Sequence, residues 1–353
     1  MKIGILSMQR VINYGSFWQA YLLKRLLASR GNIIDFIDII AGQRLIYQKK
    51  SIISRLRLKK IPFKIFFEPK RIEIFKNFTA LYLECWTHPN YSVDYDCIII
   101  GSDEVFNFAQ AAPWGFSPQL HGAIDNVNVN SYAASFGAST YEDILKYGVK
   151  NELIKASSNL KHISVRDENS LQIMKRLLPN ANIERHLDPV LVGDIPIPEK
   201  IEVKIKYILI YAYDFRFDDK DYINEIKKFA QKKGLKIYSV GFYQSWVDKN
   251  IVCDPFELLQ YFVNAEYVVT DTFHGTIFSV RCHKQFATVF RDKNRQKLSS
   301  LLKDLHLESR RLNYAKELEY LLTTSIEYKP VDESLLIERK RTDEYLKRCL
   351  FLE

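Results

Sequence analysis

The alternation of apolar runs with helical segments constrains the fold of this chain more than any other feature. Short runs rich in β-branched residues are repeatedly followed by longer segments in which apolar residues recur at helical spacing. The runs expected to form strands cover residues 2–8, 32–40, 95–100, 127–133, 163–165 and 183–187, and then 206–214, 235–242, 267–272 and 285–290. This order predicts an α/β protein with parallel sheets covered by helices.

The length of the chain indicates two domains. It has 353 residues, of which 47% are apolar, and single hydrophobic cores usually split beyond about 250–300 residues. Residues 193–206 contain two prolines and alternating charges without a helical period, as expected of a linker. We therefore predict two Rossmann-like α/β domains that face a cleft, over residues 1–195 and 196–330, with a C-terminal helix over 331–353.

Compact polar residues follow the predicted strands in both halves. They are Asn13, Gly15, Ser102, Asp103 and Arg166 in the first half, and Asp271, Thr272, His274 and Gly275 in the second. Open α/β sheets bind ligands outside the carboxyl ends of their strands. Because an arginine, a histidine and several backbone N–H groups suit an anion better than a sugar ring, the sequence predicts an anion site in the cleft.

The stretch VVTDTFHGTIFSV, residues 268–280, predicts a buried strand that turns directly into a helix. The amino end of a helix attracts phosphate or carboxylate, and a histidine there can also move a proton. The alternative is that Thr272 is only a helix cap and that His274 is a solvent-facing residue of the first turn. The stretch alone leaves both alternatives open.

Arg166 follows a short predicted strand and precedes a helix expected to be capped near Asn169 or Ser170. The planar guanidinium of an arginine at such a place can clamp an oxyanion. The alternative is a structural ion pair with Asp167 or Glu168. Asp103 and Asp271 are candidate general bases, although a carboxylate at a strand end can equally cap a helix or brace a turn.

Several classes of protein are excluded by the sequence. The five cysteines are scattered and form no CxxC pair, so neither a disulfide framework nor a zinc site is expected, and a reducing cytosol fits this pattern. The sequence contains no cluster of His, Asp and Glu at the spacing of metal ligands, no GxSxG motif of a nucleophilic serine and no phosphate-binding Walker loop. The sequence contains no export signal and no apolar run near the roughly 20 residues that span a bilayer.

The excess of positive charge lies in one segment. Residues 44–76 contain eleven Lys or Arg and two Glu, which equals the net charge of +9 of the whole chain. The basic residues alternate with Leu, Ile and Phe, as in a segment that lies on an anionic membrane surface. An ordinary helix with one solvated face is an equally good interpretation. Nucleic acid is a weaker one, because no nucleic-acid-binding motif accompanies the charge.

Several motifs together resemble the polysaccharide pyruvyl transferase family. In chain order they are INYGSFWQAYLLKRLL, DCIIIGSDEVFN, SYAASFG, ISVRDENSLQIM, LDPVLV, DPFELLQYFVNAEYVVTDTFHGTIFSV and RQKLSSLLKDLHLESR, which together cover roughly residues 1–311. The family more often carries Gln and Trp where this chain has Glu104 and Phe106. The resemblance implies a fold like that of the GT-B glycosyltransferases and a phosphoenolpyruvate donor, with no other cofactor.

The resemblance also implies a reaction and roles for individual residues. The family transfers the pyruvyl group to two sugar hydroxyls as a ketal during the synthesis of exopolysaccharides and capsules. Arg166 would bind the phosphate or carboxylate of the donor, and His274 would contact the donor with Gly275 and Thr272 beside it and act as the general acid. The acceptor would be a saccharide, either free or lipid-linked, with residues 44–76 on the acceptor side or at the inner face of the membrane.

Two other functions fit the same sequence. One is a nucleotide-sugar-dependent glycosyltransferase of GT-B-like architecture, since that fold also binds a phosphorylated donor. The other is a noncatalytic scaffold at the membrane surface, built around the basic segment.

Overall fold

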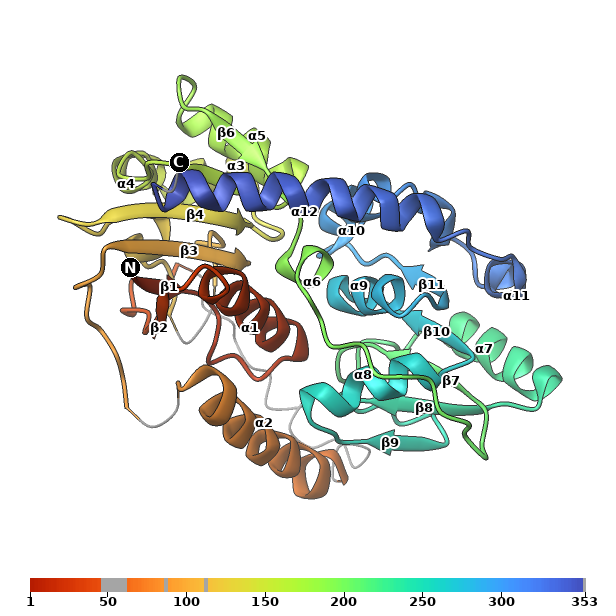
Figure 1. Ribbon diagram of the computed structural model, residues 1–353. Helices are drawn as coiled ribbons and strands as arrows, with labels where there is room; N and C mark the ends of the chain where they lie inside the picture. The colour runs from red at the N-terminus through yellow and green to blue at the C-terminus, as the bar shows by residue number, and fades with distance from the viewer. Residues whose placement is uncertain (46–61, 86–87, 111–113, 352–353) are drawn as a thin grey trace. The chain divides into compact units, whose positions relative to one another are not determined.

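The computed structural model describes residues 1–45, 62–85, 88–110 and 114–351, and contains two six-stranded sheets (Figure 1). Every pairing between strands of a sheet is parallel. The predicted α/β fold class is therefore confirmed.

The chain divides into two compact units, each with one sheet. Unit 1 consists of Met1–Lys50, Thr79–Asp194 and Ser334–Glu353, and unit 2 of Ser51–Phe78 and Ile195–Glu333. The boundary at 194/195 lies at the start of the expected linker. The units differ from the expected ranges in two places. Ser51–Phe78, expected in the first domain, belongs to unit 2, and Ser334–Glu353, which includes most of the last helix, belongs to unit 1.

The sheet of unit 1 has the strand order β2-β1-β3-β4-β5-β6. Its strands are β1 (Lys2–Leu6), β2 (Ile33–Ile37), β3 (Cys97–Asp103), β4 (Asn128–Ala134), β5 (Ile163–Val165) and β6 (Ile183–Arg185). The central strands β3 and β4 are buried along almost their whole length because both of their faces are covered, as in other parallel sheets. The strand order reverses between β1 and β3, and this is the switch point at which such sheets bind ligands.

The sheet of unit 2 has the strand order β12-β11-β10-β7-β8-β9. Its strands are β7 (Tyr207–Tyr211), β8 (Lys236–Val240), β9 (Lys249–Ile251), β10 (Tyr267–Thr270), β11 (Gln285–Val289) and β12 (Arg311–Leu312). This order is that of the dinucleotide-binding Rossmann sheet, and it reverses between β7 and β10. The short edge strands β9 and β12 were not predicted because three and two residues are too few to form a hydrophobic pattern.

The main helices of unit 1 follow its strands β1, β4, β5 and β6. They are α1 (Tyr14–Ala28), α3 (Tyr141–Tyr147), α4 (Lys150–Ser157), α5 (Glu168–Leu177) and α6 (Pro189–Val192). Two helices rather than one lie between β4 and β5, since α3 ends at Gly148, which has a left-handed φ of 70°, and α4 begins two residues later. A left-handed residue at this position ends a helix and favours glycine.

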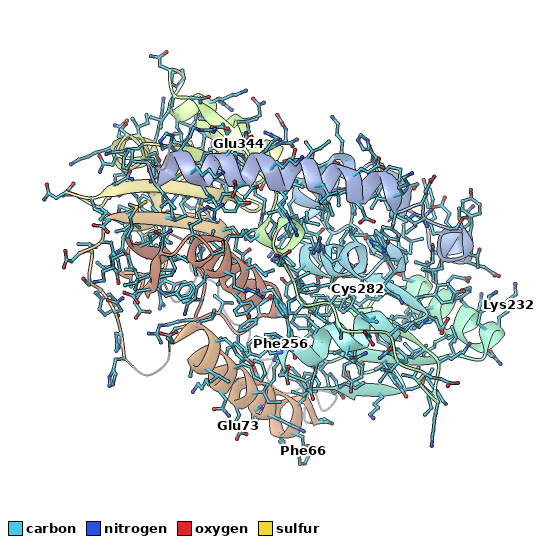
Figure 2. The ribbon with its side chains drawn as sticks, viewed as in Figure 1. Phe66, Glu73, Lys232, Phe256, Cys282 and Glu344 are labelled. Atoms are coloured by element: carbon cyan, nitrogen blue, oxygen red, sulfur yellow. The ribbon has the colours of Figure 1, made fainter. Side chains whose placement is uncertain are left out.

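The main helices of unit 2 are α7 (Lys220–Lys233), α8 (Pro255–Asn264), α9 (Phe273–Arg281), α10 (Arg295–Asp304) and α11 (Leu318–Thr323). Both α7 and α8 begin at an Asp cap, and the cap of α8, Asp254, forms a capping box with Glu257. The charged face of α7 is solvated, as Lys232 at its carboxyl end illustrates (Figure 2).

Residues 63–76 of the basic segment are helical. A π-helical turn, η3 (Phe63–Phe67), continues into α2 (Glu68–Leu83). Within unit 2, Arg71 donates to Asp214 at 3.0 Å and to the Gly241 carbonyl at 3.1 Å. Phe66 on the opposite face is 72% exposed (Figure 2). The rest of the segment, residues 46–61, lies outside the described residues.

The last helix, α12 (Lys329–Cys349), is fixed in unit 1 by buried polar contacts along its second half. The Tyr345 hydroxyl donates to the Ser131 carbonyl at 2.6 Å, and the Asn128 amide donates to the Cys349 carbonyl at 2.9 Å. The helix begins at Lys329, two residues before the predicted range of 331–353. Among the described residues, no helix is long and apolar enough to cross a membrane.

Candidate functional site

The switch point of unit 1 joins the turn after β1 to the end of β3. Asn13 caps α1, since its side-chain oxygen accepts from the backbone N–H of Gly15 at 2.8 Å and of Ser16 at 3.4 Å. The Ser16 hydroxyl then donates to Oδ2 of Asp103 at 2.8 Å. Two of the predicted site residues, Asn13 and Asp103, are thus brought together by the strand order that the sheet adopts.

Arg166 lies in the interior of unit 1 between two carboxylates. Its Nη1 atom is 2.8 Å from Oδ2 of Asp188 and 3.5 Å from Oδ1 of Asp103. Burial alone would lower the pKa of Arg166, but the nearby carboxylates, Asp188 first, outweigh it and raise the pKa above its ordinary value. The guanidinium is therefore a fixed positive charge within reach of the switch point.

An ion pair of Arg166 with Asp167 or Glu168, the alternative prediction, is not formed in the described part of the chain, and Glu168 lies 3.8 Å from Arg185. Asp167 instead caps α5, accepting from the Ser170 backbone N–H at 2.9 Å, and it also accepts from the Ser135 hydroxyl. The cap expected at Asn169 or Ser170 therefore lies two to three residues earlier. Since Asp188 is itself fully buried, its charge is balanced mainly by Arg166.

Ser102 does not fit its predicted place on a ligand-lining surface. It is 0% exposed, and both its backbone N–H and its hydroxyl donate to Oε1 of Gln19, at 3.0 and 2.8 Å. Ser102 therefore fastens β3 to α1. Gly101, just before it, has no room for a side chain, because an added Cβ would lie 2.0 Å from the Tyr132 carbonyl oxygen.

The two positions that depart from the family pattern have structural roles. Glu104 accepts from the Asn107 amide at 3.1 Å, and Phe106 is fully buried with its ring centroid 5.2 Å from that of His121. Burial lowers the pKa of His121 to about 3, so this imidazole is neutral at physiological pH. It is a core histidine and forms no part of the candidate site.

In unit 2, the predicted strand-to-helix turn is present at β10 and α9. Thr272 caps α9, and its hydroxyl accepts from the Gly275 N–H at 2.9 Å. His274 follows in the first turn with only 8% of its surface exposed, so the solvent-facing alternative is wrong. Its ring lies between those of Phe273 and Phe278, with centroids 5.4 and 6.2 Å away. The imidazole is therefore held within a fixed aromatic environment.

Gly275 is required by packing at the start of α9. An added Cβ would lie 2.2 Å from Oγ1 of Thr270, 2.6 Å from Oγ1 of Thr272 and 2.6 Å from Cδ1 of Tyr211. Its N–H is already bonded to Thr272. Gly275 therefore supports the predicted site by letting α9 approach β7 and β10 closely, which sets the position of His274.

Asp271 lies at the switch point of unit 2 and is 0% exposed. Arg291, which follows β11, places its Nε 3.5 Å from Oδ2 of Asp271, an ion pair beyond ordinary hydrogen-bond length. Burial raises the pKa of Asp271 above its ordinary value, against the opposing charges of Arg291 and Arg216. Asp271 thus belongs to a charged cluster formed by the ends of three neighbouring strands.

Sequence reasoning missed Arg216, Arg291 and Asp188. Each follows a predicted strand within a few residues, in the segments YAYDFR, VFRD and HLDP. A rule that marks every charged residue just beyond a strand would have found them. Among the described residues, no group of three or more His, Cys, Asp or Glu side chains could hold a metal ion.

Solved structures similar to this chain share the two-domain architecture. The UDP-GlcNAc 2-epimerase of Methanocaldococcus jannaschii is 11% identical with a TM-score of 0.52, covering 97% of this chain and 99% of its own. MnaA of S. aureus, solved with UDP, is 11% identical with a TM-score of 0.51 and coverages of 100% and 97%. The kitacinnamycin glycotransferase is 9% identical with a TM-score of 0.50 and coverages of 99% and 98%. At these identities the likeness concerns the fold alone, which is that of the GT-B glycosyltransferases and the UDP-GlcNAc 2-epimerases.

Comparison of the sequence with curated proteins gives no match. The family described as polysaccharide pyruvyl transferase matches residues 13–291. The matched region begins at the cap of α1 and ends at Arg291, so it contains Asp103, Arg166 and His274. The chain belongs to the polysaccharide pyruvyl transferase family.

Proposed function

We propose that this protein transfers the pyruvyl unit of phosphoenolpyruvate to two hydroxyls of a sugar as a cyclic ketal, in the synthesis of a surface polysaccharide. The observation that carries the proposal is the buried guanidinium of Arg166 beside Asp103 at the switch point of unit 1, in a chain of this family. A fixed positive charge next to a carboxylate suits a reaction that binds an anion and moves a proton.

The reaction needs one proton on carbon and one on phosphate. The C3 methylene of the donor is protonated while the first hydroxyl adds to C2, and the second hydroxyl then replaces phosphate at C2. Of the two hydroxyl protons, one ends in the new methyl group and the other on the released phosphate. The reaction therefore needs a general acid, a general base and charge stabilisation at the leaving phosphate.

The described residues supply each of these functions in our proposal. Arg166 binds the carboxylate or phosphate of the donor, and His274 at the start of α9 is the general acid. Asp103 is the better candidate for the base, because its side chain is 17% exposed whereas that of Asp271 is 0% exposed. Thr272 and Gly275 hold the first turn of α9 that carries His274.

The test is to incubate the protein with phosphoenolpyruvate and a panel of saccharides, and to look for a mass gain of about 70 Da, which is pyruvate less water. His274→Ala should reduce phosphate release at least about 100-fold, the usual scale for general acid catalysis. His306→Asn is the matched control, because His306 is exposed and has a left-handed φ of 54° that asparagine tolerates. Full activity of His274→Ala would remove that residue from the reaction.

A nucleotide-sugar glycosyltransferase is the second candidate function, favoured by the similarity of fold to a protein solved with UDP. The two candidates differ in their donor. A donor that binds the folded protein raises its unfolding temperature. Stabilisation by phosphoenolpyruvate supports pyruvyl transfer, whereas stabilisation by a UDP- or GDP-sugar alone would favour glycosyl transfer.

The basic segment is proposed to contact an anionic membrane surface or a lipid-linked acceptor. Ile65 and Phe66 are 58% and 72% exposed on η3, and Lys70 is exposed on the next turn. Vesicles containing anionic lipid should carry the protein in flotation, and a Phe66→Ser variant should bind more weakly. Flotation that is indifferent to lipid charge would count against this role.

A further inference from the structure

A charged residue follows the carboxyl end of each of three neighbouring strands in unit 2. Arg216 lies beyond β7, Asp271 beyond β10 and Arg291 beyond β11. Strands β7, β10 and β11 are neighbours in the sheet, and the order reverses between β7 and β10. The carboxyl edge at such a reversal is where Rossmann-like sheets bind phosphorylated ligands.

Arg291 is held in place from several sides. Its Nε is 3.5 Å from Asp271, its guanidinium carbon is 5.3 Å from the centroid of the Phe217 ring, and its backbone N–H donates to Asn294 at 2.8 Å. The Asn294 amide in turn donates to the Asp271 carbonyl. Residues 271, 291 and 294 are thus fixed to one another, and the guanidinium is ordered before any ligand binds.

The guanidinium of Arg291 is not fully hydrogen-bonded by the described residues. Within the described part of the chain, the buried Nε and Nη2 of Arg291 donate no hydrogen bond of ordinary geometry. The Asp271 carboxylate is contacted by Arg291 and by the Tyr213 backbone. Buried groups of this kind normally have partners, and exceptions tend to mark functional positions. Together with the exposed Arg216, the cluster has two positive charges and one negative charge, so it favours an anion.

We propose that Arg291 and Arg216 form a phosphate-binding site at the carboxyl edge of the unit 2 sheet, with Asp271 as the positioning residue that orients Arg291. Two planar guanidinium groups suit the several oxygens of a phosphate monoester better than the two oxygens of a carboxylate. The positive amino end of α9, which begins two residues after Asp271, adds to the attraction. In assigning the donor's phosphate to this site, the inference rests on the proposed function, but phosphate binding can be measured without it.

The proposal changes the role expected of Asp271. A carboxylate that is 0% exposed and paired with an arginine cannot reach a sugar hydroxyl as it stands. It can, however, hold the guanidinium plane toward a ligand. Asp271 is therefore a positioning residue here, and Asp103 remains the candidate base.

Titration calorimetry with inorganic phosphate at constant ionic strength tests the site on the full-length protein. Arg291→Gln and Arg216→Gln should each bind phosphate about 10- to 100-fold more weakly, the range for loss of a charge-assisted hydrogen bond. Arg295→Gln is the matched control, since Arg295 lies in the same segment, is 54% exposed and forms an ion pair with the exposed Asp292 at 3.5 Å. Equal phosphate affinity in all three variants would overturn the proposal.

Two further variants distinguish loss of the phosphate site from misfolding of the protein. Arg291→Lys keeps the charge but loses the planar fork, so intermediate weakening is expected. Asp271→Asn removes the positioning charge. It should weaken phosphate binding while leaving the unfolding temperature at pH 7 unchanged or higher, a combination that a purely structural role would not produce. An unfolding temperature that falls with unchanged phosphate affinity would reject the positioning role.

Binding measurements with phosphoenolpyruvate, UDP and pyruvate distinguish a failure of this inference from a failure of the proposed function. Phosphoenolpyruvate and UDP should both lose affinity in Arg291→Gln if they use the site, whereas pyruvate, which has no phosphate, should not. Weaker binding of inorganic phosphate in a protein that makes no ketal would support the site and reject the function. Ketal formation with phosphate affinity unaffected by either Gln variant would support the function and reject the site.

Discussion

The Nη1 atom of Arg166 lies 2.8 Å from Oδ2 of Asp188. The Arg166 side chain is 2% exposed and that of Asp188 is 0% exposed, so the ion pair is buried. Asp188 also caps α6, accepting from the Val190 N–H at 3.0 Å. One carboxylate therefore fixes both a helix and the arginine nearest to the switch point of unit 1.

Asp188→Asn should destabilise unit 1 and weaken donor binding together. Loss of one partner from a buried ion pair costs about 3–5 kcal/mol, because the remaining charge is left uncompensated. We expect a lower urea midpoint and a higher KM for phosphoenolpyruvate. Asp194→Asn is the control, since Asp194 is 80% exposed in its pair with Arg339. A variant as stable and active as this control would show that Arg166 does not depend on Asp188.

Gly275→Ala should destabilise the start of α9 by about 1–3 kcal/mol, the usual cost of overpacking. The reason is the 2.2 Å approach of an added Cβ to Oγ1 of Thr270. Because α9 carries His274, catalytic activity should fall with stability. Thr270→Ala removes the clashing atom, so the double variant should recover part of the loss in a double-mutant cycle. Strict additivity of the two changes would argue against the clash.

Arg71→Met should lower the stability of unit 2 by about 3–5 kcal/mol, because Asp214 would keep its charge without a partner. Burial raises the pKa of Asp214, against the opposing charge of Arg71, so this carboxylate is already costly to ionise. The double variant Arg71→Met with Asp214→Asn should recover much of the loss. Arg176→Met, at a pair with Glu142 whose side chains are 52% and 73% exposed, should change the urea midpoint little.

Stability should fall as the pH drops below the ordinary histidine range. Burial lowers the pKa of His121 to about 3 and that of His186 to about 4. Since both values are depressed on folding, the two residues contribute stability above pH 6.5, which is lost progressively toward pH 3–4. His121→Leu, which cannot be protonated, should flatten this dependence in urea unfolding at pH 7, 5.5 and 4.5. His306→Asn should leave it unchanged.

Much of the fold followed from local patterns. β-branched runs bounded by turn residues identified the central strands of both sheets, and Asn13 and Thr272 were recognisable as residues of a turn and a helix cap. The order of the strands was not accessible in the same way, because it depends on pairings between segments far apart in sequence.

The candidate site was predicted in part for the same reason. His274, Arg166 and Asp103 stand in compact polar clusters that a local reading detects. The partner of Arg166 is 22 residues away, so Asp167 next to it was the natural but wrong choice. Arg216 and Arg291 stand among other charged surface residues, and only the sheet order brings them beside Asp271.

The return of α12 to unit 1 has a consequence for how the chain is made. The carbonyl of Cys349 accepts from Asn128 at 2.9 Å, so a contact in the middle of unit 1 waits for residues synthesised 221 positions later. All segments of unit 2 precede Ser334 in the order of translation. On the ribosome, unit 2 can therefore complete its contacts first, while unit 1, although it emerges earlier, is closed last by the final helix.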